Sequence, residues 1–452
     1  MASLTSAFAP PSSIPLVPGL PLVGNLLAFR RDRLALQDRA ARIGPIARLQ
    51  LAHIPIYVVT DADLAHAVFV DQADRFKKSA GLQFLRPMLG DGLLTADGDT
   101  HKRHRKLLAP AFAPKRLEKY GAIMVEETAR QVAGWAEGQR LDLAHEMMEM
   151  TLAIAGRTMF GADVRGDAAV VAEALELGMR AQVANLRSPL QLGYEWPLPR
   201  HRQMRRAVKL LDEIVYRLIA EGRARGTDRG DVLSILLLAR DEAGGLTDAQ
   251  IRDEVMTLLL AGHETTANAL TWTWFELGRH PDVVAKLADE IGALGDRTVT
   301  TDDLPRLPYN LAVIEEAMRL HPPAYMTGRE ATQEIELGGH RLPPGAIVAV
   351  NIRGIQRRAD YFTAPGAFLP ERMLPEAKKA RPRHHYLPFG AGPRVCIGSH
   401  FALLEAQLAL ATMVQRVRVR LLAGAVEPEP LVTLRPRGGM PIEIARVIHR
   451  GA

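Results

Sequence analysis

Residues 389–398 read Phe-Gly-Ala-Gly-Pro-Arg-Val-Cys-Ile-Gly and contain Cys396, the only cysteine in this 452-residue sequence. Gly390 and Gly392 allow the backbone to turn tightly, so that its N–H groups can point at the sulfur. An apolar run from about Phe401 predicts a helix, and the positive end of its dipole would favour a thiolate. A lone cysteine is more often a small buried hydrophobic residue, but these neighbours favour a thiolate that acts as nucleophile or metal ligand.

The bulk composition is that of an ordinary globular protein. Hydrophobic residues make up 47% of the sequence, charged residues make up 24%, and the net charge is +6. The charge is spread along the chain, and no basic block is interleaved with aromatic residues, so nucleic-acid binding is not expected. A single cysteine excludes an intramolecular disulfide and a CxxC metal site, and it fits a reducing compartment.

The N-terminal residues 1–30 predict an extended, proline-rich arm. Prolines at positions 10, 11, 15, 18 and 21 interrupt any helix, and no Lys or Arg precedes residue 30. The arm contains no apolar stretch of the roughly 18 residues that a membrane-spanning helix needs. It also lacks the basic start of a signal peptide, so a cytoplasmic protein without a membrane anchor is expected.

Helical patterning dominates the sequence after the arm, with short strand-like segments between the helices. Helices are expected near residues 32–43, 63–70, 115–137, 142–160, 168–185, 199–224, 230–243 and 309–320. Strands are expected near 46–51, 56–60, 334–351 and 417–447, and loops at 77–97 and 358–388. No repeat or linker divides these segments, so residues 31–452 are expected to form a single, mainly α catalytic domain with small β-sheets.

The longest helix signal begins at Thr247-Asp-Ala-Gln250, a capping box, and no proline follows until Pro281. About 33 residues with a rise of about 1.5 Å each would make a rod of about 50 Å. The middle of this helix reads Ala261-Gly-His-Glu-Thr-Thr266, whose glycine and paired threonines are poor helix formers and predict a local defect. The His-Glu pair resembles the start of an H-E-x-x-H zinc motif, but Ala267 stands where the second histidine would be.

Two charged clusters stand out from the helical background. In Asp99-Thr-His-Lys-Arg-His-Arg-Lys106, His101 and Arg105 lie four residues apart and therefore share one helix face. A solvated helix face and a site for a buried anion are both open interpretations of this cluster. Glu316 and Arg319 lie three residues apart on another helix, which predicts an ordinary ion pair.

These stretches together resemble the signature motifs of the cytochrome P450 family. Phe389–Gly398 looks like its haem-ligand motif, and Ala261–Thr266 resembles its oxygen-activation helix. Glu316-Ala-Met-Arg319 is similar to its E-x-x-R pair, and Phe368-Leu-Pro-Glu-Arg-Met373 resembles the segment that completes that pair. The motifs follow the order of the family and span most of the sequence. The resemblance implies a cytochrome P450-like fold, with haem between the long central helix and the cysteine loop.

The resemblance also assigns residues to the cofactor, haem b (iron protoporphyrin IX). Cys396 would be the axial thiolate ligand of the iron, which in this family at large promotes O–O cleavage. Phe389 would shield the sulfur, and Gly262 would leave room for dioxygen. The expected partners of the haem propionates are His101, which stands where many relatives have tryptophan, together with Arg105, Arg329 and Arg394.

The same resemblance assigns catalysis to the middle of the long helix. Thr265 would hydrogen-bond the distal oxygen, and Glu264 would help to relay protons through water. Glu316, Arg319 and Arg372 would form a buried triad that serves folding and haem retention, because a buried charge must be paired. The implied activity is that of an O2-dependent haem-thiolate monooxygenase.

The electron source is expected to be a separate protein, because the sequence contains no flavin or iron–sulfur motif. A ferredoxin or flavodoxin with its reductase would supply the two electrons. The residues that are candidates to dock an acidic partner of this kind are Lys378, Lys379, Arg381 and Arg383. A merely solvated loop is the equally open alternative.

The substrate pocket is expected along the 82–89 loop, residues 180–198, the long helix and two turns. The candidate pocket residues are Phe84, Leu85, Met88, Leu258, Ala261, Tyr325, Met326 and Met440. Because most of them are apolar, the expected reaction is hydroxylation or epoxidation of a lipophilic compound such as a fatty acid, terpenoid or macrocycle. The alternatives are peroxide-driven oxidation or dehydration on the same fold, a haem-based sensor or electron carrier, and a haem-free cysteine hydrolase.

Overall fold

The computed structural model describes residues 14–187, 196–242, 244–422, 424 and 426–448. The chain divides into two compact units, each assembled from separate segments of the sequence. The first unit comprises Met1–Leu82, Ala324–Ala367 and Arg381–Cys396, and the second comprises Gln83–Pro323, Phe368–Ala380 and Ile397–Ala452. Helices outnumber strands in the described chain, so the predicted mainly α architecture with small β-sheets is confirmed.

A five-stranded sheet forms the centre of the first unit, with the strand order β1-β2-β10-β7-β3. The strands are β1 (Ile46–Leu51), β2 (Ile54–Val59), β10 (Ile347–Val350), β7 (Thr327–Ala331) and β3 (Phe76–Lys78). Strands β1 and β2 form an antiparallel hairpin, and β10 joins β2 in parallel with Ala349 opposite Val58. A separate hairpin consists of β8 (Ile335–Leu337) and β9 (His340–Leu342).

Both faces of this sheet are buried, because successive side chains of a strand point to opposite sides. Val58 and Ala349 pack on the face that carries α2 (Arg33–Ile43), whose Asp32 cap accepts a hydrogen bond from the Ala35 backbone N–H at 2.9 Å. Val59 and its neighbours on β10 pack on the other face, together with residues of α3 (Ala62–His66) and the π-helical turn η1 (Ala67–Asp71).

The described part of the proline-rich arm runs along β1 of the same unit. The Val17 N–H donates to the Arg48 carbonyl oxygen at 2.9 Å, and the Arg48 N–H donates back to Pro15 at 2.8 Å. Asn25 is buried, and its side-chain oxygen accepts a hydrogen bond from the Gln50 N–H at 3.0 Å. The arm ends in a short helix, α1 (Leu26–Arg31), which the proline pattern did not predict. Residues 1–13 of the predicted arm lie outside the described chain.

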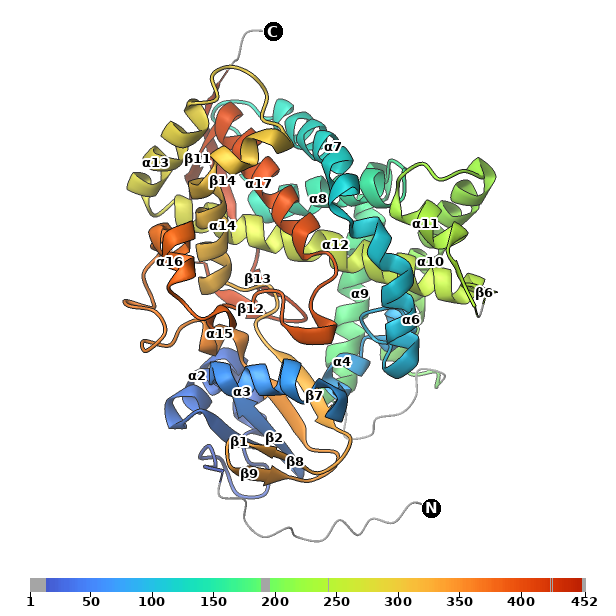
Figure 1. Cartoon of the computed structure of the whole chain (residues 1–452), viewed down its shortest axis with the longest axis vertical. Coiled ribbons are helices and arrows are strands. Elements are labelled where there is room, and N and C mark those ends of the chain that lie inside the picture. Colours follow the sequence, from blue (N-terminus) through green and yellow to red (C-terminus); the bar gives the residue numbers. More distant parts are fainter. Residues whose placement is uncertain (1–13, 188–195, 243, 423, 425, 449–452) are drawn as a thin grey trace. The chain divides into compact units, whose positions relative to one another are not determined.

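The second unit is built from helices. They are α5 (Arg86–Leu89), α6 (Gly98–Leu108), α7 (Pro114–Ala133), α8 (Leu143–Met159), α9 (Ala168–Arg187), α10 (Pro199–Arg225), α11 (Val232–Leu238), α12 (Asp248–Leu277), α13 (Pro281–Gly292), α14 (Pro308–Leu320), α16 (Pro375–Lys379) and α17 (Ser399–Arg416). Helix α12 runs through the middle of this unit and packs against α8, α10, α14 and α17 (Figure 1). None of the described helices has the length and apolar character needed to cross a membrane.

Small sheets complete the second unit. Strand β14 (Pro441–Val447) pairs with β11 (Val417–Leu421) on one side and with β4 (Arg140–Asp142) on the other. A short hairpin joins β12 (Pro428–Pro430) to β13 (Leu434–Pro436), and a smaller one joins β5 (Arg240–Asp241) to β6 (Gly244–Gly245).

The long helix predicted from the capping box is confirmed, with differences in detail. The Thr247 hydroxyl accepts from the Gln250 N–H at 3.3 Å, and the Gln250 side chain accepts from the Thr247 N–H at 3.0 Å. Helix α12 has 30 residues, which at about 1.5 Å each gives a length of about 45 Å. The local defect predicted at Ala261–Thr266 is wrong, because α-helical structure continues through this stretch.

Two predicted loops contain regular structure that their short apolar runs did not reveal. The 77–97 segment includes most of β3, the one-turn helices α4 (Ala80–Gln83) and α5, and a tight turn before α6. The 358–388 segment includes α16 and the 3-10 turns η6 (Pro370–Met373) and η7 (Arg383–His385). Elements of three to five residues are too short to show a hydrophobic period. The helix α15 (Ile352–Ile355) escaped prediction for the same reason.

Candidate functional site

The cysteine loop is a tight turn whose geometry depends on two glycines. Gly390 and Gly392 have φ angles of 70° and 71°, which side-chain-bearing residues rarely adopt. A Cβ atom at Gly392 would also collide with the carbonyl oxygen of Phe69. The loop is closed by a hydrogen bond of 3.0 Å from the Cys396 N–H to the Phe389 carbonyl oxygen. These contacts place Cys396 at the exposed end of the turn.

The exposed thiol fits a metal ligand better than a packing residue. Free cysteines are among the most buried side chains in proteins, whereas Cys396 is exposed. Helix α17 begins at Ser399, three residues further along the chain, and a helix N-terminus favours a thiolate over a thiol. The donor chemistry of the loop therefore suits a thiolate-ligated iron.

Two arginines of the first unit are connected to this loop through Phe69. Arg329 on β7 is 7% exposed, and its guanidinium lies 5.3 Å from the centre of the Phe69 ring. One of its nitrogens donates to the Gly328 carbonyl oxygen at 3.0 Å. Arg394 is half-buried in the 3-10 turn η8 (Gly392–Arg394), which packs against η1. Phe69 thus touches both the Arg329 side chain and the glycine turn, a role that no sequence motif indicated.

Helix α12 is exposed at its N-terminal end and again around its middle. Leu258 and its neighbours before the middle are buried, and so is every residue from Thr266 to Leu277. Between them Ala261 is exposed and Gly262, Glu264 and Thr265 are partly exposed. The Thr265 side chain therefore lies on an accessible stretch of the helix. The Thr265 hydroxyl donates to the Ala261 carbonyl oxygen at 2.9 Å, one helical turn back.

Glu264 takes part in a short polar chain with two residues that sequence analysis missed. Its Oε1 accepts a hydrogen bond of 2.6 Å from the Thr433 hydroxyl, and Thr433 Oγ1 accepts one of 3.1 Å from Asn268 Nδ2. Thr433 and Asn268 are buried, with exposed fractions of 5% and 1%. Thr433 lies 169 residues from Glu264 in a proline-rich segment, and no sequence pattern connects the two.

His263, the neighbour of Glu264, is buried in the core of the second unit. Its Nδ1 lies 2.6 Å from the Leu259 carbonyl oxygen, and its own carbonyl accepts from the Thr151 hydroxyl at 3.0 Å. Burial lowers the pKa of His263, so its imidazole is neutral.

The basic cluster on α6 divides into residues with different surroundings. His101 is buried and Arg105 is half-buried, and their spacing places them on one helix face as predicted. His104 instead faces α12, where its Nδ1 lies 2.6 Å from Glu254 Oε1. The other carboxyl oxygen of Glu254 accepts from the Leu93 N–H at 3.1 Å. His104 therefore contacts a buried carboxyl group, and the interpretation of the whole run as a solvated face is wrong.

The structure brings Glu316, Arg319 and Arg372 together. Arg319 forms a two-pronged contact with Glu316 at 2.8 and 2.7 Å, and Arg372 Nε lies 3.1 Å from Glu316 Oε1. The side chains of Glu316 and Arg319 are 0% exposed and that of Arg372 is 13% exposed. The Leu369 N–H also donates to Glu316, at 3.1 Å. This pairing compensates the burial of the charges.

The candidate pocket residues of the second unit are mostly enclosed by protein. Leu85, Met88 and Leu258 are buried, and the Met88 methyl group packs tightly against Gly178 of α9. The partly buried Phe84 accepts, through its carbonyl, a hydrogen bond of 3.1 Å from the Gln182 side chain. Residues 188–195 of the predicted 180–198 pocket region lie outside the described chain.

The remaining pocket candidates make contacts that the sequence did not suggest. Met440 is 0% exposed, and Thr433 at the tip of the β12–β13 hairpin donates a hydrogen bond to Glu264. In the first unit, the Tyr325 hydroxyl accepts a hydrogen bond of 3.2 Å from Arg33. Met326 accepts one of 3.3 Å, through its sulfur, from Gln37. Both of these side chains are therefore engaged with α2.

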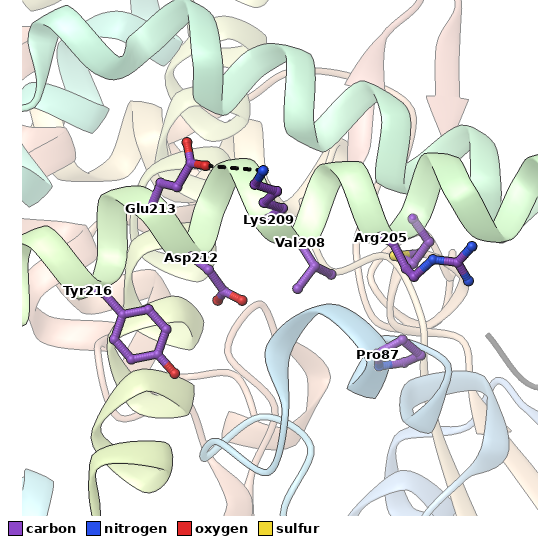
Figure 2. Close-up of a pocket in the computed structure, with 8 residues that line it drawn as sticks. Pro87, Arg205, Val208, Lys209, Asp212, Glu213 and Tyr216 are labelled. Carbon is purple, nitrogen blue, oxygen red and sulfur yellow. Dashed lines mark ion pairs between the residues drawn. The ribbon is translucent and has the colours of Figure 1, made fainter. Parts of the chain in front are cut away.

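A separate groove lies on the outer side of α10 in the second unit. It has a volume of about 600 Å³ and is lined by Pro87 of α5 and by residues of α10 that include Lys209, Glu213 and Tyr216 (Figure 2). Lys209 and Glu213 form an ion pair of 4.0 Å in its wall. Apart from Pro87, which lies in the predicted 82–89 segment, the groove contains none of the predicted site residues.

Comparison with known proteins places the chain among haem enzymes. A family model described as Cytochrome P450 matches residues 14–440. Cyclooctatin synthase of Streptomyces melanosporofaciens is 38% identical over 422 residues, which cover 92% of each protein. Cyclooctat-9-en-7-ol 5-monooxygenase of the same organism is 34% identical and covers 90% of this chain and 89% of its own. Pentalenene oxygenase of Streptomyces avermitilis is 33% identical, with coverages of 95% and 94%.

A solved structure agrees with these relatives. The haem domain of cytochrome P450DA matches 96% of this chain and 98% of its own, with a TM-score of 0.87 and 28% sequence identity. The predicted fold class, family and reaction class are therefore confirmed. An exposed thiol on a glycine turn fits the haem-thiolate cofactor of that family. The chain belongs to the cytochrome P450 family and is a bacterial-type monooxygenase with a haem-thiolate cofactor.

Proposed function

We propose that this monooxygenase hydroxylates or epoxidises a cyclic terpenoid. The observation that carries the proposal is the pair of Streptomyces relatives named for cyclooctat-9-en-7-ol, a cyclic unsaturated alcohol, and for pentalenene. Each of them aligns with nine-tenths or more of this chain. The apolar candidates Leu85, Met88 and Leu258 suit such a substrate better than a charged one, because they offer no partner to a carboxylate. Fatty acids and macrocycles are the alternative substrates, and the binding experiment described below distinguishes them from terpenoids.

We further propose that the cofactor is haem b and that Cys396 is its axial ligand. Bound haem supplies a thiolate-ligated iron that activates O2, as throughout this family. Phe389 would shield the sulfur, and its carbonyl oxygen accepts the hydrogen bond from the Cys396 N–H. The two carboxylates of the haem would be bound by His101, Arg105, Arg329 and Arg394, since cations compensate anionic groups that are taken out of water.

Protons are proposed to move through Glu264 and Thr265. Glu264 is partly exposed, so its carboxyl group can exchange a proton with water and pass it towards Thr265 Oγ1. The Thr265 hydrogen is directed at the Ala261 carbonyl, which leaves the oxygen lone pairs of the hydroxyl to accept a hydrogen bond. Gly262 adds no side chain to this exposed stretch. An intact acid–threonine pair favours the use of O2 over peroxide-driven oxidation.

The Glu316, Arg319 and Arg372 triad is proposed to serve folding and haem retention. All three side chains are largely withdrawn from solvent and pair with one another, so they offer no group to a substrate. Their role is therefore to hold α14 against η6 within the second unit.

The electron donor is proposed to be a ferredoxin or flavodoxin with its reductase. Lys378 is paired with Glu315 at 2.8 Å and Lys379 with Glu376 at 2.9 Å, so an acidic donor would compete with these carboxylates. Arg381 lies over the Phe362 ring at 5.0 Å, and Arg383 is exposed. A reduction rate that falls steeply with salt concentration would support docking on these cations. The cytoplasmic location inferred from the sequence stays a prediction.

Substrate binding tests the proposal directly. The purified holoenzyme is titrated with pentalenene, cyclooctat-9-en-7-ol, lauric acid and a macrolide lactone, and the spin-state shift of the Soret band is recorded. We expect a saturable shift with at least one of the two terpenoids and a weaker response to the others. A saturable shift with lauric acid or the macrolide alone would reject the terpenoid assignment.

A further inference from the structure

The tip of the β12–β13 hairpin is attached to one face of α12. Glu264, Asn268 and Trp272 follow one another at intervals of four residues, so their side chains line the same face of the helix. Glu264 and Asn268 bind the Thr433 hydroxyl at 2.6 and 3.1 Å, and Trp272 Nε1 donates to the Leu434 carbonyl oxygen at 2.9 Å.

The hairpin tip is fixed independently of Glu264. Strands β12 and β13 pair in register, with Pro430 opposite Leu434. The Leu431 N–H donates to the Thr433 carbonyl at 3.1 Å, and the Leu434 N–H donates to the Pro323 carbonyl at 2.9 Å. Thr433 therefore keeps its position without the carboxylate. The contact with Glu264 restrains the carboxylate more than it restrains the hairpin.

Each hydrogen bond in the series Asn268–Thr433–Glu264 has a fixed donor and a fixed acceptor. Asn268 Nδ2 has only hydrogens to offer, so Thr433 Oγ1 accepts from it, and the one hydrogen of the Thr433 hydroxyl is left for Glu264 Oε1. Such a chain strengthens each of its bonds by polarising the next one. The Asn268 side chain is buried, which shields the chain from competing water.

We propose that Thr433 is a positioning residue for Glu264. Its hydroxyl holds Oε1 of the carboxylate in one orientation, so that the proton which Glu264 exchanges with water is handled at Oε2. Asn268 orients the Thr433 hydroxyl for this purpose. The inference rests on the proposed proton-relay role of Glu264, but it does not depend on the identity of the substrate.

The test compares Thr433→Val, which keeps the shape of the side chain but removes the hydroxyl, with Thr433→Ser, which keeps the hydroxyl. Both variants are measured as holoenzymes, alongside Glu264→Gln and the double variant Glu264→Gln/Thr433→Val. The probe is whichever of pentalenene, cyclooctat-9-en-7-ol and lauric acid shifts the Soret band of the wild type most. The measured quantities are product formed per NAD(P)H consumed, the solvent hydrogen isotope effect, the substrate dissociation constant and the thermal unfolding midpoint.

We expect Thr433→Val to lower coupling about tenfold, a part of the roughly hundredfold or more that a positioned proton-transfer group contributes. Thr433→Ser should stay within about twofold of the wild type, because it keeps the donor. The dissociation constant should change by less than about twofold in both variants, since Thr433 acts through Glu264 and not on the substrate. The double variant should couple no worse than Glu264→Gln, and the two changes should be non-additive in the unfolding midpoint.

Several results would overturn the inference, and they separate it from the proposed function. If Glu264→Gln uncouples the enzyme but Thr433→Val does not, Thr433 has no positioning role and the role of Glu264 stands. If Glu264→Gln itself stays coupled, the proposed proton relay fails and this inference fails with it. A large change in the dissociation constant with unchanged coupling would make Thr433 a substrate contact. If Thr433→Val loses haem, Thr433→Ala is measured in the same way.

Discussion

Glu405 is a buried acid of the second unit whose proton should make stability depend on pH. It lies on α17 and is 1% exposed. Neither of its carboxyl oxygens has a hydrogen-bond partner of good geometry among the described residues. Thr266 offers the nearby hydroxyl, but this group donates to the Gly262 carbonyl at 3.5 Å. Burial therefore raises the pKa of Glu405 well above its ordinary value, and Thr266 opposes the shift only weakly.

The direction in which stability changes with pH depends on whether the unfolded or the folded protein loses the Glu405 proton first. Above the ordinary value of 4.5, the unfolded chain releases the Glu405 proton while the folded protein retains it. The stability that the protonated acid contributes is therefore complete below that pH and is lost as the pH rises towards the raised pKa. One proton changes the free energy of unfolding by at most about 1.4 kcal/mol per pH unit, so the protein should lose stability between about pH 5.5 and about pH 7.

Glu405→Gln removes this proton equilibrium and keeps the size of the side chain. The free energy of unfolding is measured by urea titration of the holoenzyme, followed by circular dichroism, at both pH values. We expect the free energy of unfolding to fall less between the lower and the higher pH in Glu405→Gln than in the wild type, because the variant has no proton to lose at this position. Glu137→Gln, at an exposed glutamate, is the matched control and should leave the difference unchanged. Equal pH dependence in the wild type and Glu405→Gln would refute the reasoning.

Three further changes probe other parts of the account. Gly392→Ala forces a Cβ atom against the Phe69 carbonyl oxygen, so we expect this variant to bind less haem. Gly366→Ala, at a position with open space around it, is the control and should bind haem normally. Equal haem content in both variants would contradict this reasoning. Arg319→Ala leaves Glu316 buried without its main partner and should lower the free energy of unfolding by about 3–5 kcal/mol. Lys379→Ala, which removes an exposed ion pair, is the control. An equally small loss of stability in both variants would show that the triad is dispensable. Thr265→Ala should keep haem and substrate binding but divert electrons from NAD(P)H to peroxide, and unchanged product yield per NAD(P)H would rule out its proposed role.

Local sequence signals predicted the parts of the fold that depend on neighbours in the chain. The capping box at Thr247 located the start of α12, and the glycines around Cys396 predicted its tight turn. Both signals act within a few residues, so one sequence is enough to read them. The resemblance to the cytochrome P450 family then supplied the architecture that composition and periodicity left open.

Contacts between distant segments could not be predicted in this way. Glu264 and Thr433 are 169 residues apart, and His104 and Glu254 are 150 residues apart. Nothing in the sequence near Thr433 or near His104 indicates these distant partners. The contacts of Tyr325 and Met326 with α2 also join residues that are far apart in the sequence. The helical defect expected in α12 is absent because an α-helix tolerates Gly262 and because Thr265 bonds to the preceding turn.

The spectrum of the reduced protein with carbon monoxide tests the central claim most directly. If Cys396 is the thiolate ligand of haem, the reduced wild-type protein with carbon monoxide shows the red-shifted Soret band of thiolate ligation. Cys396→Ala should abolish that band, while an apolar change elsewhere, such as Val432→Ala at the exposed hairpin tip, should retain it. A wild-type protein without the red-shifted band, or a Cys396→Ala variant that keeps it, would contradict the account.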